Sequence, residues 1–313
     1  MLQPALEAGL RQTMKRLVRP LLTPRLPISA QRLLIRQAYR SSIPPRGTRY
    51  SRETLGGVPA LRTCWSHTPA GVVLYFHGGA YIIGSPDTHR GITGHLAKAS
   101  GCEVIAPDYR LAPEHPFPAA LDDAEASYLA LLEGGCPPHR IAFAGDSAGG
   151  GLCLALALRL KAAGQPLPSS LTLFSPWTDL TQSRLYSPAS EPVLQAEWTR
   201  HAARLYAGDH ALDTPLLSPV FGDLSGLPPM LIQVGGDEIL LNDSERLATR
   251  ARRQGTEVRL DIHNGLWHVF QVHSGPLARA TAAMATAGEH IRTHLTDGSP
   301  PAPAPPSGAW ASA

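Results

Sequence analysis

One pentapeptide, Gly145-Asp146-Ser147-Ala148-Gly149, carries the strongest chemical signal in the sequence. Its G-x-S-x-G pattern follows a short apolar run at 141–144 and precedes a segment rich in Leu and Ala. On a sharp turn from strand to helix, a serine hydroxyl is exposed as a nucleophile, and the flanking glycines allow the turn. The helix that follows would direct its N–H groups and its positive end at a developing negative charge. The pattern therefore predicts Ser147 as a nucleophile.

A serine hydroxyl attacks efficiently only when a base takes its proton, and that base is usually a histidine. His268 is the expected base, because it lies between the last predicted strand and the final predicted helix, where a loop can carry it to the edge of a sheet. His263 and His273 are the weaker alternatives. His77 precedes the serine in the chain, and we expect its ring to support its own loop by hydrogen bonds.

The histidine in turn needs a carboxylate, which in nucleophile sites of this kind follows the serine and precedes the histidine. Asp237 comes directly after the predicted strand 230–234, so it is the expected acid. Glu238 and Asp243 remain open as rivals. The inference depends on all three partners lying just past the ends of strands.

A glycine-rich loop, His77-Gly78-Gly79-Ala80-Tyr81, follows the predicted strand 72–76. A tetrahedral intermediate needs preorganised N–H donors for its oxyanion, and glycines let a loop backbone approach the substrate closely. The N–H of Ala148, next after the serine, would add a donor. This loop is therefore the expected oxyanion hole.

The elements that position these residues alternate between strands and helices. Short apolar runs predict strands at 72–76, 104–107, 141–144, 171–174 and 230–234, and alternation of polar and apolar residues predicts another at 257–262. Helical periodicity separates them at 116–133, 149–163, 242–254 and 276–295. Such an alternation predicts an α/β fold with a mostly parallel sheet covered on both faces.

Segments at the start, middle and end of the chain stand outside this alternation. Residues 1–40 show basic, amphipathic helical periodicity, and we expect their apolar stripe to pack on the protein rather than on a membrane surface. Residues 176–228 form a long insertion between strands, which predicts a lid. The expected division is a helical cap segment at 1–45, a catalytic domain at 46–296 with a cap insertion at about 178–220, and a disordered Pro/Ala-rich tail at 297–313.

Composition excludes several classes of protein. The 313 residues carry a net charge of +3 without a dense basic stripe, so no nucleic-acid partner is expected. No zinc spacing joins Cys64, Cys102, Cys136 and Cys153, and no phosphate-binding or metalloprotease motif occurs, so neither metal nor organic cofactor is expected. The start has no secretory signal and no run of 18 apolar residues exists, which predicts a cytoplasmic protein without membrane insertion. The assembly is left open, a homodimer included.

Six motifs in one order make the sequence resemble the hormone-sensitive-lipase-like carboxylesterases, the bacterial family IV. They are HGGAYIIGS at 77–85, DYRLAPEHPFPAALDD at 108–123, GDSAGG at 145–150, SPWTDL at 175–180, GGDEILLND at 235–243 and GLWHVF at 265–270. The resemblance covers roughly residues 65–295.

This resemblance implies an α/β-hydrolase fold with a helical cap, and hydrolysis of small esters with short- to medium-chain acyl groups. Carried onto this sequence, it assigns Ser147, Asp237 and His268 as the triad. It also assigns the N–H groups of Gly79, Ala80 and Ala148 as oxyanion donors, with Gly78 shaping the loop.

Two departures from the family pattern, and two rival functions, qualify that expectation. Ala80 stands where the family often has glycine, and its Cβ narrows the space beside the oxyanion. Asp237-Glu238-Ile239-Leu240 replaces the family's Asp-Pro-Leu.

A lactone hydrolase or an amidase would use the same triad, and a non-catalytic binding module with this fold is the alternative from a different class. We expect Trp177, Trp198 and Tyr206 to limit the acyl pocket, so that activity peaks between C4 and C8 chains.

Overall fold

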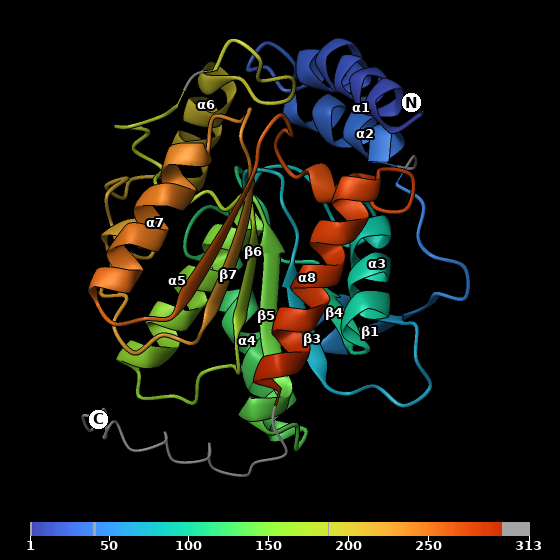
Figure 1. Cartoon of the computed structure of the whole chain (residues 1–313). Helices are drawn as coiled ribbons and strands as arrows, with labels where there is room; N and C mark the ends of the chain where they lie inside the picture. Colours follow the sequence, from blue (N-terminus) through green and yellow to red (C-terminus); the bar gives the residue numbers. More distant parts are fainter. Residues whose placement is uncertain (1, 40–41, 187, 296–313) are drawn as a thin grey trace, which may run out of the picture.

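A central sheet of eight strands organises the described part of the computed structural model, which comprises residues 2–39, 42–186 and 188–295 (Figure 1). The strand order is β1-β2-β4-β3-β5-β6-β7-β8. Strands β3 to β8 pair in parallel, whereas β2 pairs in antiparallel with both β1 and β4. The strands are β1 (Arg49–Leu55), β2 (Val58–Cys64), β3 (Val72–Phe76), β4 (Glu103–Pro107), β5 (Ile141–Asp146), β6 (Leu171–Phe174), β7 (Met230–Gly235) and β8 (Val258–His263). The predicted mostly parallel sheet is confirmed.

The register brings the ends of several parallel strands to one edge of the sheet. Between β3 and β5, Phe76 lies opposite Gly145. Between β7 and β8, Gly235 lies opposite His263. Loops that leave the carboxyl ends of neighbouring parallel strands meet at the same edge. The glycine-rich loop after β3, the serine turn after β5 and the loops after β7 and β8 therefore share this edge.

Helices cover both faces of the sheet because its central strands are apolar on both sides. Along β3, Val73 and Tyr75 join one core, while Leu74 and Phe76 join the other. The first core is closed by α3 (Arg90–Ser100) and α8 (Ala278–His294), and the second by α4 (Ala119–Glu133), α5 (Ala148–Ala162) and α7 (Leu241–Arg253) (Figure 1). Short helical turns are η4 (Pro138–Arg140), η5 (Pro219–Phe221) and η6 (Phe270–His273). This three-layer arrangement holds the carboxyl edge of the sheet rigid beneath the loops.

The N-terminal segment, predicted to be helical over residues 1–40, consists of two helices with a break between them. Helix α1 (Leu2–Thr13) runs into a π turn, η1 (Met14–Val18), and a 3-10 turn, η2 (Arg19–Leu21); α2 (Ile28–Ala38) then begins afresh. The connection contains Pro20, Pro24 and Pro27. Proline lacks an N–H donor and clashes with the preceding turn of a helix, so the helix stops and turns back here.

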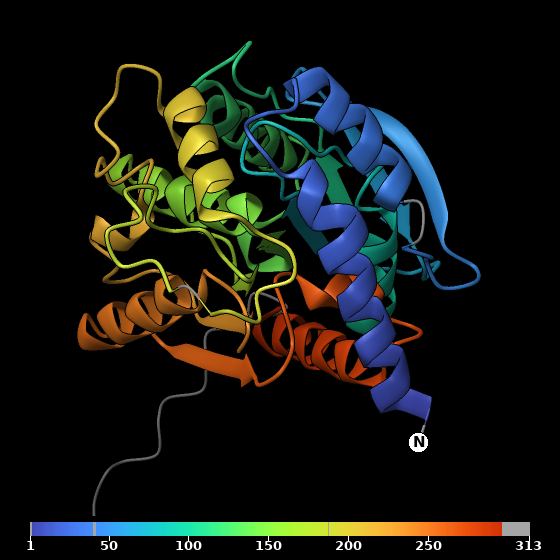
Figure 2. The same cartoon turned by 90° about the horizontal axis from the view of Figure 1, so that it is seen from above.

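The N-terminal helices and helix α6 (Ala196–Ala207) lie together over the carboxyl end of the sheet (Figures 1 and 2). The amide of Gln195 donates to the carbonyl oxygens of Arg19 and Leu22, each at 2.9 Å. The indole of Trp198 donates to Gln31 Oε1 at 2.8 Å. These contacts join the start of the chain to the insertion, and we call the two pieces the cap (residues 2–38 and 188–207).

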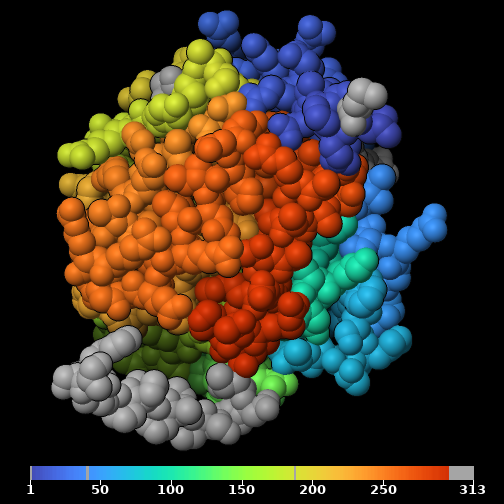
Figure 3. Space-filling view, viewed as in Figure 1, coloured from blue at the N-terminus to red at the C-terminus, as the bar shows by residue number. Residues whose placement is uncertain are grey.

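Other parts of the described chain differ from the pattern seen in the sequence or lie outside it. Strands β1 and β2 were not predicted; the residues of the edge strand β1 are mostly exposed and lack an apolar face. The space-filling view shows the cap covering the top of the molecule (Figure 3).

The tail predicted at 297–313 lies outside the described residues. Among the described helices, none is both long enough and apolar enough to cross a membrane.

Candidate active site

Ser147 lies on the sharp turn between β5 and α5, as the pentapeptide predicts. Its backbone has φ 53° and ψ −120°, a conformation that costs energy for any residue other than glycine and is typical of functional turns. The glycines on either side are required by crowding: a Cβ on Gly149 would collide with the carbonyl of Phe76, and one on Gly145 would lie 2.5 Å from the Gly149 oxygen. The turn therefore fixes the hydroxyl at the carboxyl edge of the sheet.

The glycine-rich loop lies beside this turn and offers backbone N–H groups. Gly79 has φ 120° and Ala80 φ 52°, so the loop turns sharply after β3. Gly78 donates its N–H to Asp146 Oδ1 at 3.0 Å, which leaves it a shaping role. Among the described residues, none accepts a hydrogen bond from the N–H groups of Gly79, Ala80 or Ala148. These three donors are free to receive an oxyanion.

A buried aspartate–histidine pair behind the loop was not anticipated from the sequence. Asp146 Oδ1 accepts a hydrogen bond from the Tyr75 hydroxyl at 2.6 Å, and His89 Nε2 lies 3.4 Å away. Burial alone would raise the pKa of Asp146, but the charge and hydrogen bond of His89 hold it below its ordinary value. The pair anchors Gly78 and hence the oxyanion loop. Its sequence signal was the aspartate inside the serine pentapeptide.

His77 supports the same loop and is unsuited to act as a base. Its Nδ1 lies 2.8 Å from the carbonyl oxygen of Gly78, and its ring stacks on Tyr109 with centroids 4.2 Å apart. Burial, together with the neighbouring His89, lowers the pKa of His77 to about 3. It is therefore a neutral, fully enclosed ring, as the expected supporting role requires.

The structure gives His268 a different carboxylate partner from the one predicted. His268 Nδ1 lies 3.1 Å from Glu238 Oε1, and both side chains are buried. Glu238 is oriented through its other oxygen, which accepts hydrogen bonds from the Ser175 hydroxyl at 2.7 Å and from the Gly235 N–H at 2.8 Å. Burial would lower the pKa of His268, but the hydrogen bond and charge of Glu238 raise it above its ordinary value.

Asp237 points away from this pair, so the prediction that it holds His268 is wrong. Its carboxylate pairs with Arg11 of α1 at 2.7 Å and stays partly exposed, at 28%. Its backbone N–H donates to the carbonyl of Leu266 at 2.9 Å, which ties the acid loop to the histidine loop. In this tight turn, neighbouring residues project to opposite sides, and the outcome depends on backbone geometry that the sequence does not display.

The remaining rivals, Asp243, His263 and His273, lie outside the cavity that holds Ser147. Asp243 accepts the N–H groups of Thr178 and Asp179, each at 2.9 Å, and burial raises its pKa to about 7. His263, at the end of β8, packs its ring on Phe270 with centroids 4.7 Å apart.

A second buried glutamate, Glu191, connects the cap to the acid loop. Its Oε1 accepts the N–H of Val193 at 2.6 Å, and its Oε2 accepts the N–H of Ile239 at 2.9 Å. Burial raises the pKa of Glu191. Ile239 follows Glu238 directly, so this contact fixes the backbone beside the acid. Nothing in the Pro-containing insertion singled out Glu191 in the sequence.

Two small chambers meet at His268. The first has a volume of about 40 Å³ and is lined by Ser147, His268, the oxyanion loop and cap residues that include Trp198. The second, also about 40 Å³, shares His268, Val269 and Tyr39 with the first and is also lined by residues of η1, α2 and η6. Among the described residues, no hydrogen bond joins Ser147 to His268; such bonds are often long until substrate binds.

Of the three aromatic residues predicted to limit the acyl pocket, Trp198 lines the first chamber. Tyr206 instead stacks on Tyr81 with centroids 3.7 Å apart, and Trp177 is buried beside that pair. Neither of these two lines a chamber. The cap therefore limits the pocket mainly through Trp198 and aliphatic residues.

Comparison with known proteins gives a consistent result. Residues 73–272 match a family described as having an alpha/beta hydrolase fold. An acetyl-hydrolase of Streptomyces hygroscopicus is 42% identical over 72% of this chain and 77% of its own. An esterase of Acinetobacter venetianus is 40% identical over 70% of this chain and 73% of its own.

Solved structures agree. A hormone-sensitive lipase from a metagenome library has a TM-score of 0.87 and 38% identity, over 95% of this chain and 99% of its own. An esterase from the bacterial hormone-sensitive lipase family has a TM-score of 0.86 and 36% identity, over 95% and 99%. The chain belongs to this alpha/beta hydrolase family, among the hormone-sensitive-lipase-like esterases. It is a carboxylic ester hydrolase.

Proposed function

We propose that the protein hydrolyses esters of short acyl groups through an acyl-enzyme, with Ser147 as nucleophile, His268 as base and Glu238 as the acid that orients it. One observation carries the proposal: His268, held by a buried carboxylate, lines the same chamber as Ser147 and the oxyanion loop. Esterase and acetyl-hydrolase relatives support the substrate class.

The mechanism takes two steps of acyl transfer. His268 takes the proton of the Ser147 hydroxyl as its oxygen attacks the ester carbonyl, and Glu238 stabilises the imidazolium that forms. The N–H groups of Gly79, Ala80 and Ala148 hold the oxyanion. His268 then gives its proton to the departing alkoxide. Water attacks the acyl-enzyme by the same route and releases the acid.

The size of the first chamber sets the acyl length that we propose. One water needs roughly 10–15 Å³ of such volume, so a chamber of about 40 Å³ holds only a few non-hydrogen atoms without rearrangement. This favours acetyl to butyryl groups, at and below the lower end of the range expected from the sequence. Lactones and amides are the other substrate classes that the same triad could hydrolyse.

Hydrolysis of p-nitrophenyl butyrate by the wild type and by Ser147→Ala tests the proposal. The variant should lose on the order of 10⁴–10⁶ in kcat while keeping its circular dichroism spectrum. His268→Ala should cost nearly as much, and the double variant little more, since the residues act as a unit. A Ser147→Ala protein with a tenth of the wild-type rate would exclude Ser147 as nucleophile.

A further inference from the structure

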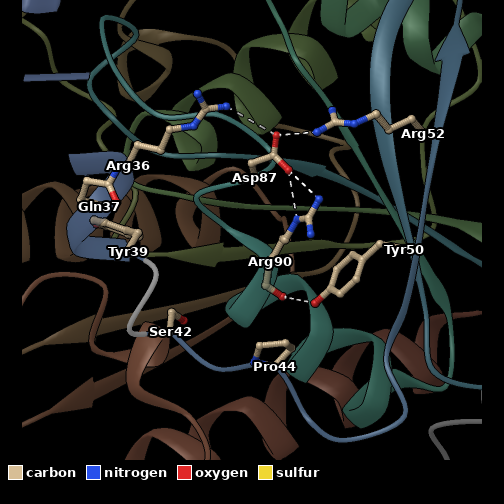
Figure 4. Close-up of a pocket in the computed structure, with 9 residues that line it drawn as sticks. All are labelled: Arg36, Gln37, Tyr39, Ser42, Pro44, Tyr50, Arg52, Asp87 and Arg90. Carbon is tan, nitrogen blue, oxygen red and sulfur yellow. Dashed lines mark hydrogen bonds and ion pairs between the residues drawn. The ribbon is translucent and has the colours of Figure 1, made fainter. Parts of the chain in front are cut away.

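A pocket on the surface beside the cap is lined by three arginines (Figure 4). Its volume is about 660 Å³, far larger than either chamber at His268. The residues that matter here are Arg36, Tyr39, Ser42, Arg52, Asp87 and Arg90. They come from α2, from the chain that follows α2, from β1, from the turn before α3 and from the start of α3. The catalytic steps above use none of the three arginines.

The three arginines face one carboxylate, Asp87 (Figure 4). Arg52 Nη2 lies 2.8 Å from Asp87 Oδ2, and Arg90 Nη2 lies 2.7 Å from Asp87 Oδ1. Arg36 Nη2 is more distant, at 3.9 Å, and its side chain is 63% exposed. A guanidinium has five N–H donors, so most donors of Arg36 and Arg52 remain available to a ligand.

Positive charge exceeds negative charge around this pocket. Asp108 is the second nearby carboxylate and interacts electrostatically with Asp87, Arg52 and Arg36. Three guanidinium groups therefore face two carboxylates. A positive, concave surface attracts anions.

The pocket adjoins the catalytic chambers. Tyr39 lines the arginine pocket and both chambers, and Ser42 lines the arginine pocket and the second chamber. The ring of Tyr39 lies 5.6 Å from that of His89, whose Nε2 is 3.4 Å from Asp146 Oδ1. Asp146 precedes Ser147, so a short series of contacts leads from the pocket to the nucleophile.

We propose that the arginine pocket binds an anionic group, a carboxylate or a phosphate, carried on the alcohol part of the ester substrate. His268 must protonate the departing alkoxide, so the alcohol part lies on the His268 side of the site. The second chamber borders His268 and shares Tyr39 and Ser42 with the arginine pocket. The inference rests on the proposed esterase function and names the substrate class more closely: esters of small acids with anionic alcohols.

The experiment compares two acetyl esters with the same phenyl ring, 4-acetoxybenzoate, which is anionic, and its neutral methyl ester. The ratio of their kcat/KM values is measured for the wild type and for Arg36→Gln/Arg52→Gln. We expect the ratio to fall by about three- to tenfold, as the loss of two partly exposed ion pairs implies. The fall in the ratio should come from a higher KM for the anionic ester. In the wild type, added salt should lower the ratio.

Arg184→Gln/Arg253→Gln is the matched control, because both arginines are exposed and line a different surface pocket. It removes the same net charge and should leave the ratio unchanged. An unchanged ratio in Arg36→Gln/Arg52→Gln, or an equal fall in the control, would overturn the proposed site. The neutral ester reports separately on the triad: if the wild type fails to hydrolyse it, the proposed function itself is wrong.

Discussion

Replacing each of the two neighbouring acids of the loop after β7 by its amide tests the triad most sharply. Glu238→Gln removes the charge that faces His268 Nδ1 at 3.1 Å, whereas Asp237→Asn removes a charge that faces Arg11 at 2.7 Å. Both variants replace one carboxylate by an amide of the same size. The sequence resemblance predicts that Asp237→Asn is the damaging change, and the structure predicts that Glu238→Gln is.

The expected magnitudes follow from the two environments. A hydrogen bond between buried charged groups contributes about 1.5–3 kcal/mol, or roughly 10- to 150-fold in rate at 1.4 kcal/mol per factor of ten. An amide in place of the acid also favours the wrong tautomer of the base, and in a comparable triad the total loss is about 10⁴ in kcat. We expect a loss of roughly 10³–10⁴ for Glu238→Gln. Asp237 is partly exposed, so its ion pair contributes little, and Asp237→Asn should change kcat by less than about threefold.

Steady-state kinetics on p-nitrophenyl acetate provides the assay, with thermal unfolding of both variants as the control for folding. A Glu238→Gln protein that keeps more than a tenth of the wild-type kcat would refute the reasoning, and so would a severe loss in Asp237→Asn. Loss of activity in both variants, together with lower unfolding temperatures, would show that the substitutions had damaged the structure of the loop and not only the acid.

Other predictions concern pH, acyl length and the cap. Activity requires neutral His268, whose pKa is raised, so kcat/KM should increase with pH through a midpoint above about 6.5. Glu238→Gln should move that midpoint lower. A rate that falls from pH 5 to 8 would contradict a histidine base. Across p-nitrophenyl esters, kcat/KM should peak at acetate to butyrate and fall sharply by octanoate. Each extra methylene must displace packed side chains, at a cost of about 1–3 kcal/mol. A palmitate ester hydrolysed as fast as the butyrate ester would refute the closed chamber. Trp198→Ala should move the peak to longer chains, while Trp177→Ala, outside both chambers, should not; the same ester series measures both.

Much of the fold was determined by local features of the sequence. Apolar runs of four to six residues, separated by helical periodicity, predict a parallel sheet because both faces of its central strands are buried. The serine turn was equally predictable from the sequence. Contacts with the backbone of β3 and of the turn itself require glycine on both sides of the serine. His268 was identified by its place after the last strand, and the structure puts it in the chamber of Ser147.

Features that depend on long-range packing could not be predicted in this way. The break in the N-terminal helix has local causes in its prolines, but the docking of this segment depends on contacts such as Trp198 with Gln31, which are 167 residues apart. Tyr206 and Trp177 have the size to limit a pocket, yet they pack around Tyr81 instead. The arginine pocket is likewise assembled from α2, β1 and α3, so no sequence window displays it.

The choice between Asp237 and Glu238 shows where the sequence stops being sufficient. The sequence places two adjacent acids after β7, and either one has the chemistry to hold a histidine. The tertiary structure decides between them, because Ser175 and the Gly235 N–H orient Glu238 inward while Arg11, from the far end of the chain, holds Asp237 outward. Residue types and order determine which reaction is chemically available, whereas the direction of a side chain in a turn depends on neighbours that only folding brings together.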